Sequence, residues 1–239
     1  MRALLLAGGH GTRLGDLTQA KNKHMLTVGD RPMLGHALQA LSTRRIDDLG
    51  IVVGRHSRAI IEYVGDGGAW GFDGVTYIRQ PEPLGLAHAI LRASMFLRDE
   101  PFLMYLGDNL LEAGVEPFLD TYSPGVEAVL GAVEVPNPQA FGVVELDKDN
   151  HILGLEEKPE RPRSNLALVG VYIFGETACD VARTLRPSAR GEYEITDLIR
   201  GISAEGREIR VLRLKGFWKD CGTLESIKEA EALLRRRGE

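Results

Sequence analysis

Near its N-terminus the chain reads Leu4-Leu5-Leu6-Ala7-Gly8-Gly9-His10-Gly11-Thr12-Arg13-Leu14. The apolar residues at the start of this stretch do not alternate with polar ones, which is typical of a parallel strand covered on both faces. The glycines that follow let backbone N–H groups approach an anion closely. Arg13 adds a planar guanidinium suited to phosphate, and Lys23 is a second cation soon after it. The stretch therefore predicts a buried strand that leads into a phosphate-binding loop.

Two common nucleotide-binding motifs do not fit this loop. No Gly-Lys-Ser/Thr follows the glycines, so the loop is not a Walker A motif. Leu14 stands where the dinucleotide fingerprint requires a third small residue. The second mismatch argues against a dinucleotide-dependent oxidoreductase, an alternative that NAD(P) binding would revive.

The composition is that of one ordinary globular domain. The chain has 239 residues, of which 44% are hydrophobic and 26% charged. A net charge of −5 offers no electrostatic footprint for nucleic acid. Cys179 and Cys221 form no CxxC motif and are expected to be reduced thiols. No apolar run is long enough for a membrane span, so we expect a cytoplasmic protein without nucleic-acid or membrane partners.

Buried strands alternate with amphipathic helices in the first half of the chain. This alternation predicts an α/β fold, with a Rossmann-like mixed, mostly parallel central sheet flanked by helices. Ligands of such sheets bind beyond the carboxyl ends of the strands. The glycine loop, Gln80 with Gly85, and Asp108 all follow strands and are expected to meet at one edge. The predicted strands are 3–6, 51–54, 75–78 and 102–106, and the predicted helices are 33–41, 57–64 and 86–97.

The second half has short turns between its strands and fewer helices. Its predicted strands are 126–135, 141–146, 152–156, 167–174, 209–214 and 217–218, and its predicted helices are 177–185, 192–202 and 224–236. Because no linker or repeat divides the chain, residues 1–239 are interpreted as one domain. A nucleotide-binding half, about 1–115, would be covered by a second half, about 116–239.

Several blocks of the chain resemble the sugar-1-phosphate nucleotidyltransferases. They stand in collinear order over nearly the whole chain, and chance does not assemble that many. Within this family the likeness is strongest to the glucose-1-phosphate thymidylyltransferases, in a short form. The blocks are Leu6 to Leu14 with Lys23, Arg31-Pro32-Met33, Gly65-Asp66-Gly67 with Trp70-Gly71, Gln80-Pro81 with Gly85-Leu86-Ala87, Leu106-Gly107-Asp108-Asn109, Phe141 to Glu145, Leu155 to Pro159, Pro187 to Glu192 with Glu194 to Asp197, and Trp218-x-Asp220-x-Gly222-Thr223.

The resemblance implies a two-substrate site for a nucleoside triphosphate and a sugar 1-phosphate. It implies catalytic roles for Arg13 and Lys23. It implies nucleotide binding by Leu6, Ala7, Gly8, Gly9, Gly11, Thr12, Arg13, Gln80 and Gly85. It implies sugar-phosphate binding by Asn109, Gly142, Glu157, Lys158, Gly170 and Arg190, and Mg²⁺ ligation by Asp108 and Asp220.

The side-chain chemistry suits these implied roles. A Gln80 amide donates and accepts at once, so it can pair with the edge of a pyrimidine base. Two carboxylates at strand ends suit Mg²⁺, which takes a few carboxylates together with phosphate oxygens and water. Glu157 would accept hydrogen bonds from sugar hydroxyls, and Lys158 would contact the sugar phosphate. Each residue alone has a plainer interpretation as a turn residue or a surface charge.

The implied reaction needs no general base, because the sugar phosphate oxygen is already anionic. Positioning and electrostatic stabilisation dominate transfers of this kind. We therefore expect a direct in-line displacement that gives an NDP-sugar and pyrophosphate, with dTTP and glucose 1-phosphate favoured as substrates.

Two alternatives to this enzyme fit the same sequence. A uridylyltransferase of the same class and a non-catalytic regulatory relative are the alternatives, although Arg13, Lys23 and both aspartates favour an enzyme.

The chain departs from the family pattern at Thr27 and Asp16, where the family often has proline, and these changes affect loop rigidity more than catalysis. The chain ends soon after the last predicted helix, whereas larger relatives carry a further C-terminal segment, so their oligomeric state and feedback control do not carry over; a homo-oligomer is an expectation for this chain. The six histidines show no zinc spacing and are expected to be ordinary surface or loop residues, with His24 adjoining the site.

Overall fold

The computed structural model describes residues 1–9 and 22–237. Its strands are β1 (Arg2–Ala7), β2 (Thr27–Val28), β3 (Arg31–Pro32), β4 (Asp48–Val53), β5 (Gly74–Arg79), β6 (Phe102–Leu106), β7 (Asn109–Leu111), β8 (Val126–Glu134), β9 (Gly142–Leu146), β10 (Ile152–Glu157), β11 (Leu166–Phe174), β12 (Glu208–Arg213) and β13 (Trp218–Asp220). Its α-helices are α1 (Met33–Leu41), α2 (Arg58–Val64), α3 (Leu86–Leu97), α4 (Glu116–Thr121), α5 (Ala178–Thr184), α6 (Ile195–Ala204) and α7 (Leu224–Arg237). Short 3₁₀ helices lie at Lys23–Met25, Gly68–Trp70 and Pro138–Ala140.

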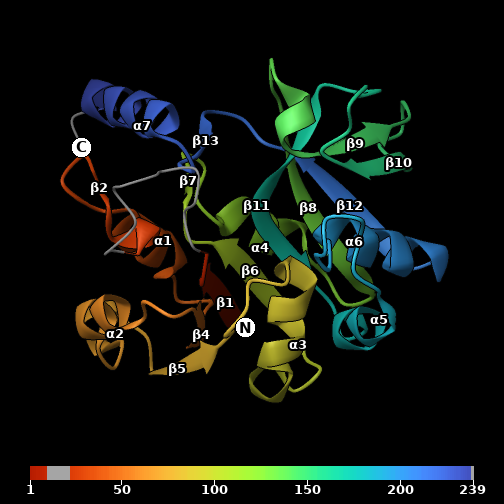
Figure 1. Ribbon diagram of the computed structural model, residues 1–239. Coiled ribbons are helices and arrows are strands. Elements are labelled where there is room, and N and C mark those ends of the chain that lie inside the picture. The colour runs from red at the N-terminus through yellow and green to blue at the C-terminus, as the bar shows by residue number, and fades with distance from the viewer. Residues whose placement is uncertain (10–21, 238–239) are drawn as a thin grey trace.

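One mixed sheet forms the centre of the molecule (Figure 1). Its strand order is β10-β9-β11-β6-β1-β4-β5, and β8 also pairs with β11 and carries β12 at its other edge. β6, β1, β4 and β5 are mutually parallel, whereas β11 is antiparallel to its neighbours. The predicted class, a mixed and mostly parallel sheet flanked by helices, is confirmed.

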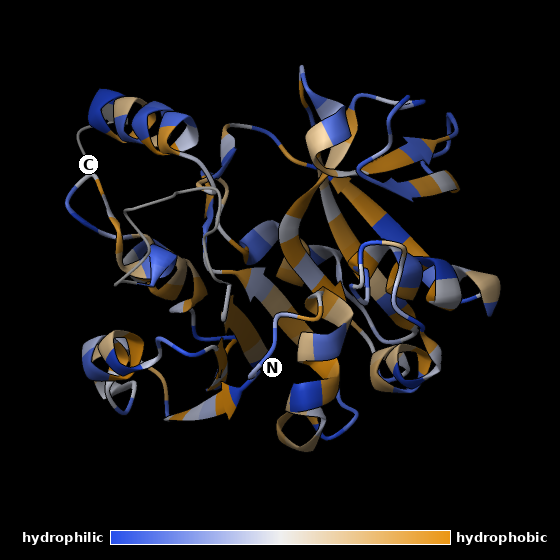
Figure 2. Cartoon of the chain, in the orientation of Figure 1, coloured by the Kyte–Doolittle hydropathy of each residue, from blue (hydrophilic) through white to orange (hydrophobic). Residues whose placement is uncertain are grey.

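The strand β1 has both faces covered, as its uninterrupted apolar sequence predicts. Leu4 and Leu6 belong to a core shared with α3, α5 and α6, whereas Leu5 belongs to a core shared with α1, α2 and α4. Figure 1 shows α3, α5 and α6 side by side, and Figure 2 shows the central strands coloured hydrophobic along most of their length. Burying each of these leucine side chains contributes about 1.5–3 kcal/mol, so the sheet is anchored from both sides.

A third core holds the C-terminal helix against the rest of the chain. Ile227, Ala230 and Leu234 of α7 pack with a set of buried residues from the segments around β2, α1, β7 and β13, namely Val28, Met33, Leu110 and Cys221. Leu224, expected on the same apolar side, is 49% exposed, because it lies in the first turn of α7, outside this core. Both cysteines are free and buried.

Element boundaries differ from the predictions where turns are compact. α6 begins at Ile195 rather than at residue 192, since residues 188–192 form a turn in which Ser188 N donates to Glu192 O at 2.8 Å. The short elements α4 and β7 were not predicted. Among the described residues, no helix combines the length and the apolar character needed to cross a membrane.

Candidate active site

The carboxyl ends of the parallel strands lie together, as the topology requires. Gln80 N donates to Val53 O and Gly107 N donates to Leu6 O, each at 3.0 Å, so the turns after β5 and β6 are tied to neighbouring strands. Close backbone approach is visible at Gly54, where a Cβ would lie 2.6 Å from the carbonyl oxygen of Gly8. The expected convergence of the three strand ends is therefore observed.

Three residues of the glycine stretch to which roles are assigned, Gly11, Thr12 and Arg13, lie outside the described residues. Within the described part, Leu6 and Ala7 are buried in β1 and face the two opposite cores. Gly8 and Gly9 follow directly, and a Cβ at Gly9 would lie 3.4 Å from Lys23 Nζ.

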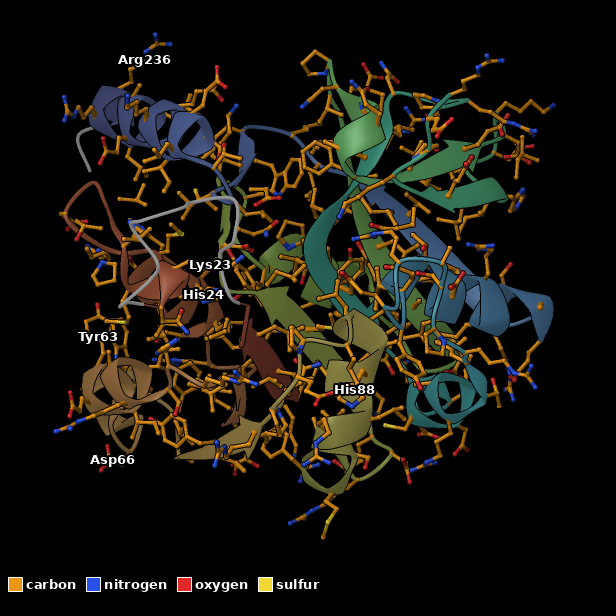
Figure 3. All side chains as sticks on the ribbon, in the orientation of Figure 1. Lys23, His24, Tyr63, Asp66, His88 and Arg236 are labelled. Carbon is orange, nitrogen blue, oxygen red and sulfur yellow. The ribbon has the colours of Figure 1, made fainter. Side chains whose placement is uncertain are left out.

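Asn22 and His24 hold Lys23 at this edge. The Asn22 amide donates to Ala7 O at 3.1 Å, and its oxygen accepts from the backbone N–H of His24 at 2.9 Å. The same oxygen lies 2.7 Å from His24 Nδ1, so the ring carries its proton on that nitrogen. Figure 3 shows Lys23 and His24 in adjacent positions.

His24 is not a surface residue, which corrects the expectation for this histidine. Its relative exposure is 2%, because it lies against the turn at Gly107. Burial, together with the charge of Lys23, lowers the pKa of His24 to about 3 although Asp108 opposes the shift. His24 is therefore a neutral structural support for the lysine beside it.

Asp108 and Asp220 are brought together by the pairing of β7 with β13. Asp220 lies opposite Asn109 in this antiparallel ladder, and Cys221 N donates to Asp108 O at 2.8 Å. The Asp108 carboxylate forms an ion pair with Lys23. Burial favours the protonated acid, but Lys23, His24 and hydrogen bonds from Lys23 and Asn109 together hold the pKa of Asp108 below its usual range. Asp108 is therefore a buried carboxylate that stays ionised.

Asn109 connects the two strands to the neighbouring strand β11. Its Nδ2 donates to Asp108 Oδ1 at 3.0 Å, and its Oδ1 accepts from Gly170 N at 3.0 Å and from Trp218 Nε1 at 2.6 Å. A Cβ at Gly170 would lie 2.7 Å from both polar atoms of the Asn109 amide. The observed contacts of Asn109 and Gly170 thus position the protein itself, and their sugar-binding roles stay predictions.

The predicted sugar-phosphate residues gather across the cleft. Gly142 pairs with Glu157 between β9 and β10. Glu157 Oε1 lies 3.8 Å from Lys158 Nζ and 3.4 Å from an Arg190 guanidinium nitrogen, and the same nitrogen lies 3.2 Å from Glu194 Oε1. Burial raises the pKa of Glu157; the cations Lys158 and Arg190 oppose the rise, whereas Glu194 and Glu192 add to it.

A cleft of about 680 Å³ joins the two groups of residues. This volume lies within the range typical of small-molecule sites. Its walls contain these residues assigned from the sequence: Gly9, Lys23, Asp108, Asn109, Gly142, Glu157, Lys158, Gly170, Arg190 and Asp220. Gln80 and Gly85 are not among its lining residues, but Gln80 Oε1 lies 3.6 Å from a Cβ built at Gly8, the residue before Gly9.

The sequence assigned no site role to several other walls of the cleft, among them Trp218, Phe141 and Glu194. Trp218 and Phe141 rings pack edge to face with centroids 5.0 Å apart. Glu194 is buried and accepts a hydrogen bond from Ser188 Oγ at 2.8 Å. All three residues stand inside the blocks that carry the resemblance, so their place in those blocks was the available signal.

Gly85 has a structural reason for being glycine. Its φ is +103°, and a Cβ would lie 2.5 Å from the carbonyl oxygen of Tyr193. Two backbone hydrogen bonds fix this contact, from Tyr193 N to Leu84 O at 2.8 Å and from Ala87 N to Tyr193 O at 3.1 Å. The segment after Gln80 is thus joined to the turn that carries Arg190.

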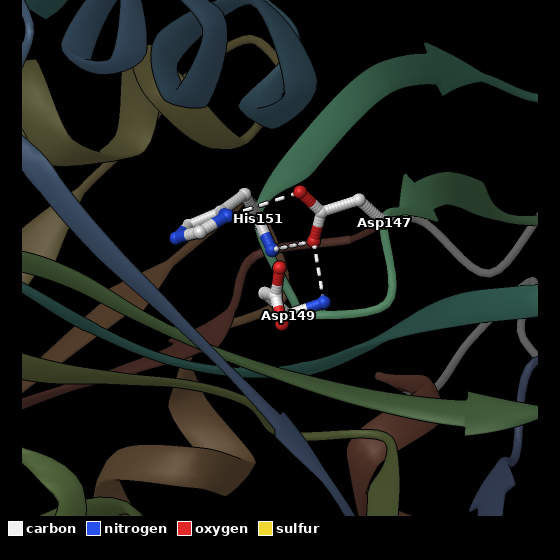
Figure 4. A group of neighbouring side chains, drawn as sticks. All are labelled: Asp147, Asp149 and His151. Atoms are coloured by element: carbon white, nitrogen blue, oxygen red, sulfur yellow. Dashed lines mark hydrogen bonds and ion pairs between the residues drawn. The ribbon is translucent and has the colours of Figure 1, made fainter.

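A second group of acidic and histidine side chains lies away from the cleft (Figure 4). Asp147, Asp149 and His151 occupy the turn between β9 and β10, at the opposite end of this hairpin from Gly142 and Glu157. Asp147 Oδ1 accepts from the backbone N–H groups of Asp149 and His151, each at 2.8 Å. Turn formation accounts for these contacts.

The family model for nucleotidyl transferases matches residues 2–237. The chain belongs to the nucleotidyl transferase family. A glucose-1-phosphate thymidylyltransferase of Streptomyces antibioticus is 42% identical over 231 residues, which are 96% of this chain and 65% of that protein. The chain thus spans less than two thirds of that relative's length.

Two solved structures extend the likeness to the fold. A Bacillus anthracis protein described as a glucose-1-phosphate thymidylyltransferase, in complex with sucrose, superposes with a TM-score of 0.91 at 32% identity, over 98% of this chain and 96% of the other. A UDP-glucose pyrophosphorylase in complex with UDP-glucose superposes with a TM-score of 0.88 at 26% identity, over 99% and 98% of the two chains. The first of these proteins is named for a sugar phosphate, and the second for a sugar nucleotide.

Proposed function

We propose that this nucleotidyl transferase joins dTTP and glucose 1-phosphate to give dTDP-glucose and pyrophosphate. The observation that carries the proposal is the single cleft in which Asp108 and Asp220 face Glu157 and Arg190. One wall has acidic groups suited to a metal–triphosphate, and the other has a carboxylate and cations suited to a sugar phosphate. The name of the Streptomyces antibioticus relative, a glucose-1-phosphate thymidylyltransferase, supports the choice of dTTP and glucose 1-phosphate as substrates.

The two halves of the chain would each bind one substrate, and Asp220 of the second half would join Asp108 at the metal. Residues of about 1–115 would bind the triphosphate, with Lys23 and Arg13 close to its phosphates. Residues of about 116–239 would bind the sugar phosphate, with Glu157 accepting from hydroxyl groups and with Lys158 and Arg190 neutralising the phosphate. A phosphate oxygen of the sugar would then attack the α-phosphorus in line, and pyrophosphate would leave from the opposite side.

The donor set at the nucleotide end fits Mg²⁺. Asp108 and Asp220 supply two carboxylates from adjacent strands, and triphosphate oxygens and water would complete the hard oxygen ligands that Mg²⁺ prefers. When bound, Mg²⁺ would supply positive charge beside the phosphates. The chain's own residues would position that charge: Asn109 orients the Asp108 carboxylate, and Lys23 remains paired with it.

Other parts of the proposal rest on the sequence alone. They are a cytoplasmic location, the absence of nucleic-acid partners and a homo-oligomer. UTP is the alternative nucleotide, because uracil differs from thymine by one methyl group, which is worth roughly 1–3 kcal/mol in a binding site.

Pyrophosphate release tests the proposal directly. The purified protein is assayed with dTTP, UTP, dCTP and dGTP, each combined with glucose, galactose and mannose 1-phosphates, with Mg²⁺ or with EDTA. We expect the highest rate with dTTP and glucose 1-phosphate, and loss of that rate in EDTA. Absence of turnover with every pair would favour a non-catalytic relative, and a higher rate with UTP would replace the proposed nucleotide.

A further inference from the structure

The Gln80 side chain is buried between the turn after β1 and the start of α3. Its Nε2 lies 3.1 Å from Gly85 O and 2.9 Å from Nδ1 of His88 on α3. Its Oε1 lies on the other side, 3.6 Å from a Cβ built at Gly8. The nitrogen end of the amide therefore faces α3, and the oxygen end faces the glycine turn.

The two partners determine the orientation of this amide. A carbonyl oxygen only accepts hydrogen bonds, so the Gln80 atom beside Gly85 O must be the NH₂ group. The second N–H of that group is directed at His88 Nδ1, which must then offer a lone pair. A neutral ring with its proton on Nε2 does so. Gln80 thus has both donors committed within the protein and offers only Oε1 to a ligand.

We propose that His88 is a positioning residue for base specificity, because its Nδ1 accepts from Gln80 and so leaves Gln80 as a pure acceptor toward the base. This inference rests on the proposed function, in which Gln80 contacts the base. A pure acceptor pairs with a base that has an N–H at its ring edge, such as N3–H of thymine or uracil. Cytosine has a lone pair at N3, and that lone pair would be repelled by Oε1.

The surroundings of His88 keep its ring neutral and oriented. Burial and then the charge of Arg92 lower the pKa of His88, and Glu82 opposes them. The ring stacks on Tyr193, with centroids 5.9 Å apart and an interplanar angle of 28°. Figure 3 shows His88 on α3. The backbone of Tyr193 is hydrogen-bonded to Leu84 and Ala87, on either side of Gly85. The His88 ring is therefore positioned both by α3, which carries it, and by the segment of Tyr193, on which it stacks.

The test is a comparison of dTTP and dCTP binding, which differ only in the base. Dissociation constants are measured by calorimetry with Mg²⁺ and without a sugar phosphate, for the wild type and three variants. His88→Phe keeps a ring against Tyr193 but removes the acceptor. His88→Asn restores an acceptor near the Nδ1 position. His56→Phe, at an exposed histidine, is the matched control. Thermal midpoints establish that each variant is folded.

We expect the preference for dTTP over dCTP to fall about tenfold in His88→Phe, the effect of one hydrogen bond gained or lost. His88→Asn should recover most of it, and His56→Phe should not change it. An unchanged preference in folded His88→Phe would overturn the inference, and so would an equal loss in both His88 variants. A wild type that binds no nucleoside triphosphate would contradict the proposed function itself.

Discussion

The ammonium group of Lys23 forms an ion pair with the carboxylate of Asp108, although the two residues are 85 positions apart. The pair joins the segment after the glycine turn to the end of β6, and both side chains line the cleft. The pair is formally neutral, so it holds the Lys23 ammonium in place without adding net charge to a chain whose net charge is −5.

Replacing Asp108 tests the metal-binding proposal. Asp108→Asn keeps the size of the side chain but removes its charge, so we expect pyrophosphate release to fall on the order of 10²–10³-fold, as for loss of a key charge-stabilising group. Asp149→Asn, at an exposed aspartate in the β9–β10 turn, is the control and should leave the rate unchanged. A near-normal rate in Asp108→Asn would remove this residue from the metal site.

The buried histidine predicts a pH dependence of stability. The unfolded chain takes up a proton on His24 near pH 6.5, whereas the folded chain does so only near pH 3. Stability is therefore lost as the pH falls below about 6.5, by about 2 kcal/mol for this group between pH 7.5 and pH 5. In His24→Asn this contribution should disappear from the free energy of unfolding, measured by urea denaturation at the two pH values. The same pH dependence in wild type and variant would contradict the prediction.

The tight packing at Gly170 predicts a cost for any side chain there. The Cβ of Gly170→Ala would press on the Asn109 amide, so we expect a loss of about 1–3 kcal/mol in the free energy of unfolding. Gly74→Ala is a matched control at the start of a strand, since a Cβ there meets nothing within 4 Å. Urea denaturation of both variants measures the difference, and equal stabilities would contradict the packing argument.

Arg190 should act on one substrate only. In Arg190→Gln the guanidinium that would meet the sugar phosphate is lost, so we expect KM for glucose 1-phosphate to rise roughly tenfold while KM for dTTP stays within a factor of two. Arg161→Gln, at an exposed arginine, should alter neither constant. A parallel rise in both constants for Arg190→Gln would show that the effect spreads through Glu157 and Glu194 rather than through the phosphate.

The long elements of the fold could be predicted because their patterns are continuous. β6 and α3 begin and end at the predicted residues, the first as an apolar run and the second as a 3.6-residue stripe that follows Gly85. β7 and β13 have three residues each, too few for a period to appear, and only β13 overlaps a predicted strand, 217–218. Their pairing depends on tertiary contacts, and it is this pairing that brings Asp220 beside Asp108.

Many of the residues that the sequence assigned line one cleft, but the contacts among them could not be predicted. Lys23, Asp108, Glu157 and Arg190 share one cleft, as the positions of their motifs imply. The sequence does not show that Asn109 is held by Gly170 and Trp218, because those residues lie 61 and 109 positions away. The burial of His24 was hidden for the same reason, since it depends on contact with the turn at Gly107, far along the chain.

The two backbone hydrogen bonds between Leu84, Ala87 and Tyr193 have a consequence for dissecting this chain. They join a segment of the first half of the chain to a segment of the second half, so the contact is made by residues that are distant in the sequence. A fragment that ends near residue 115 would keep Gln80 but lose the backbone that holds Gly85 and the ring that supports His88. The proposed base selection therefore requires the whole chain, and we expect neither half to show it as a separate piece.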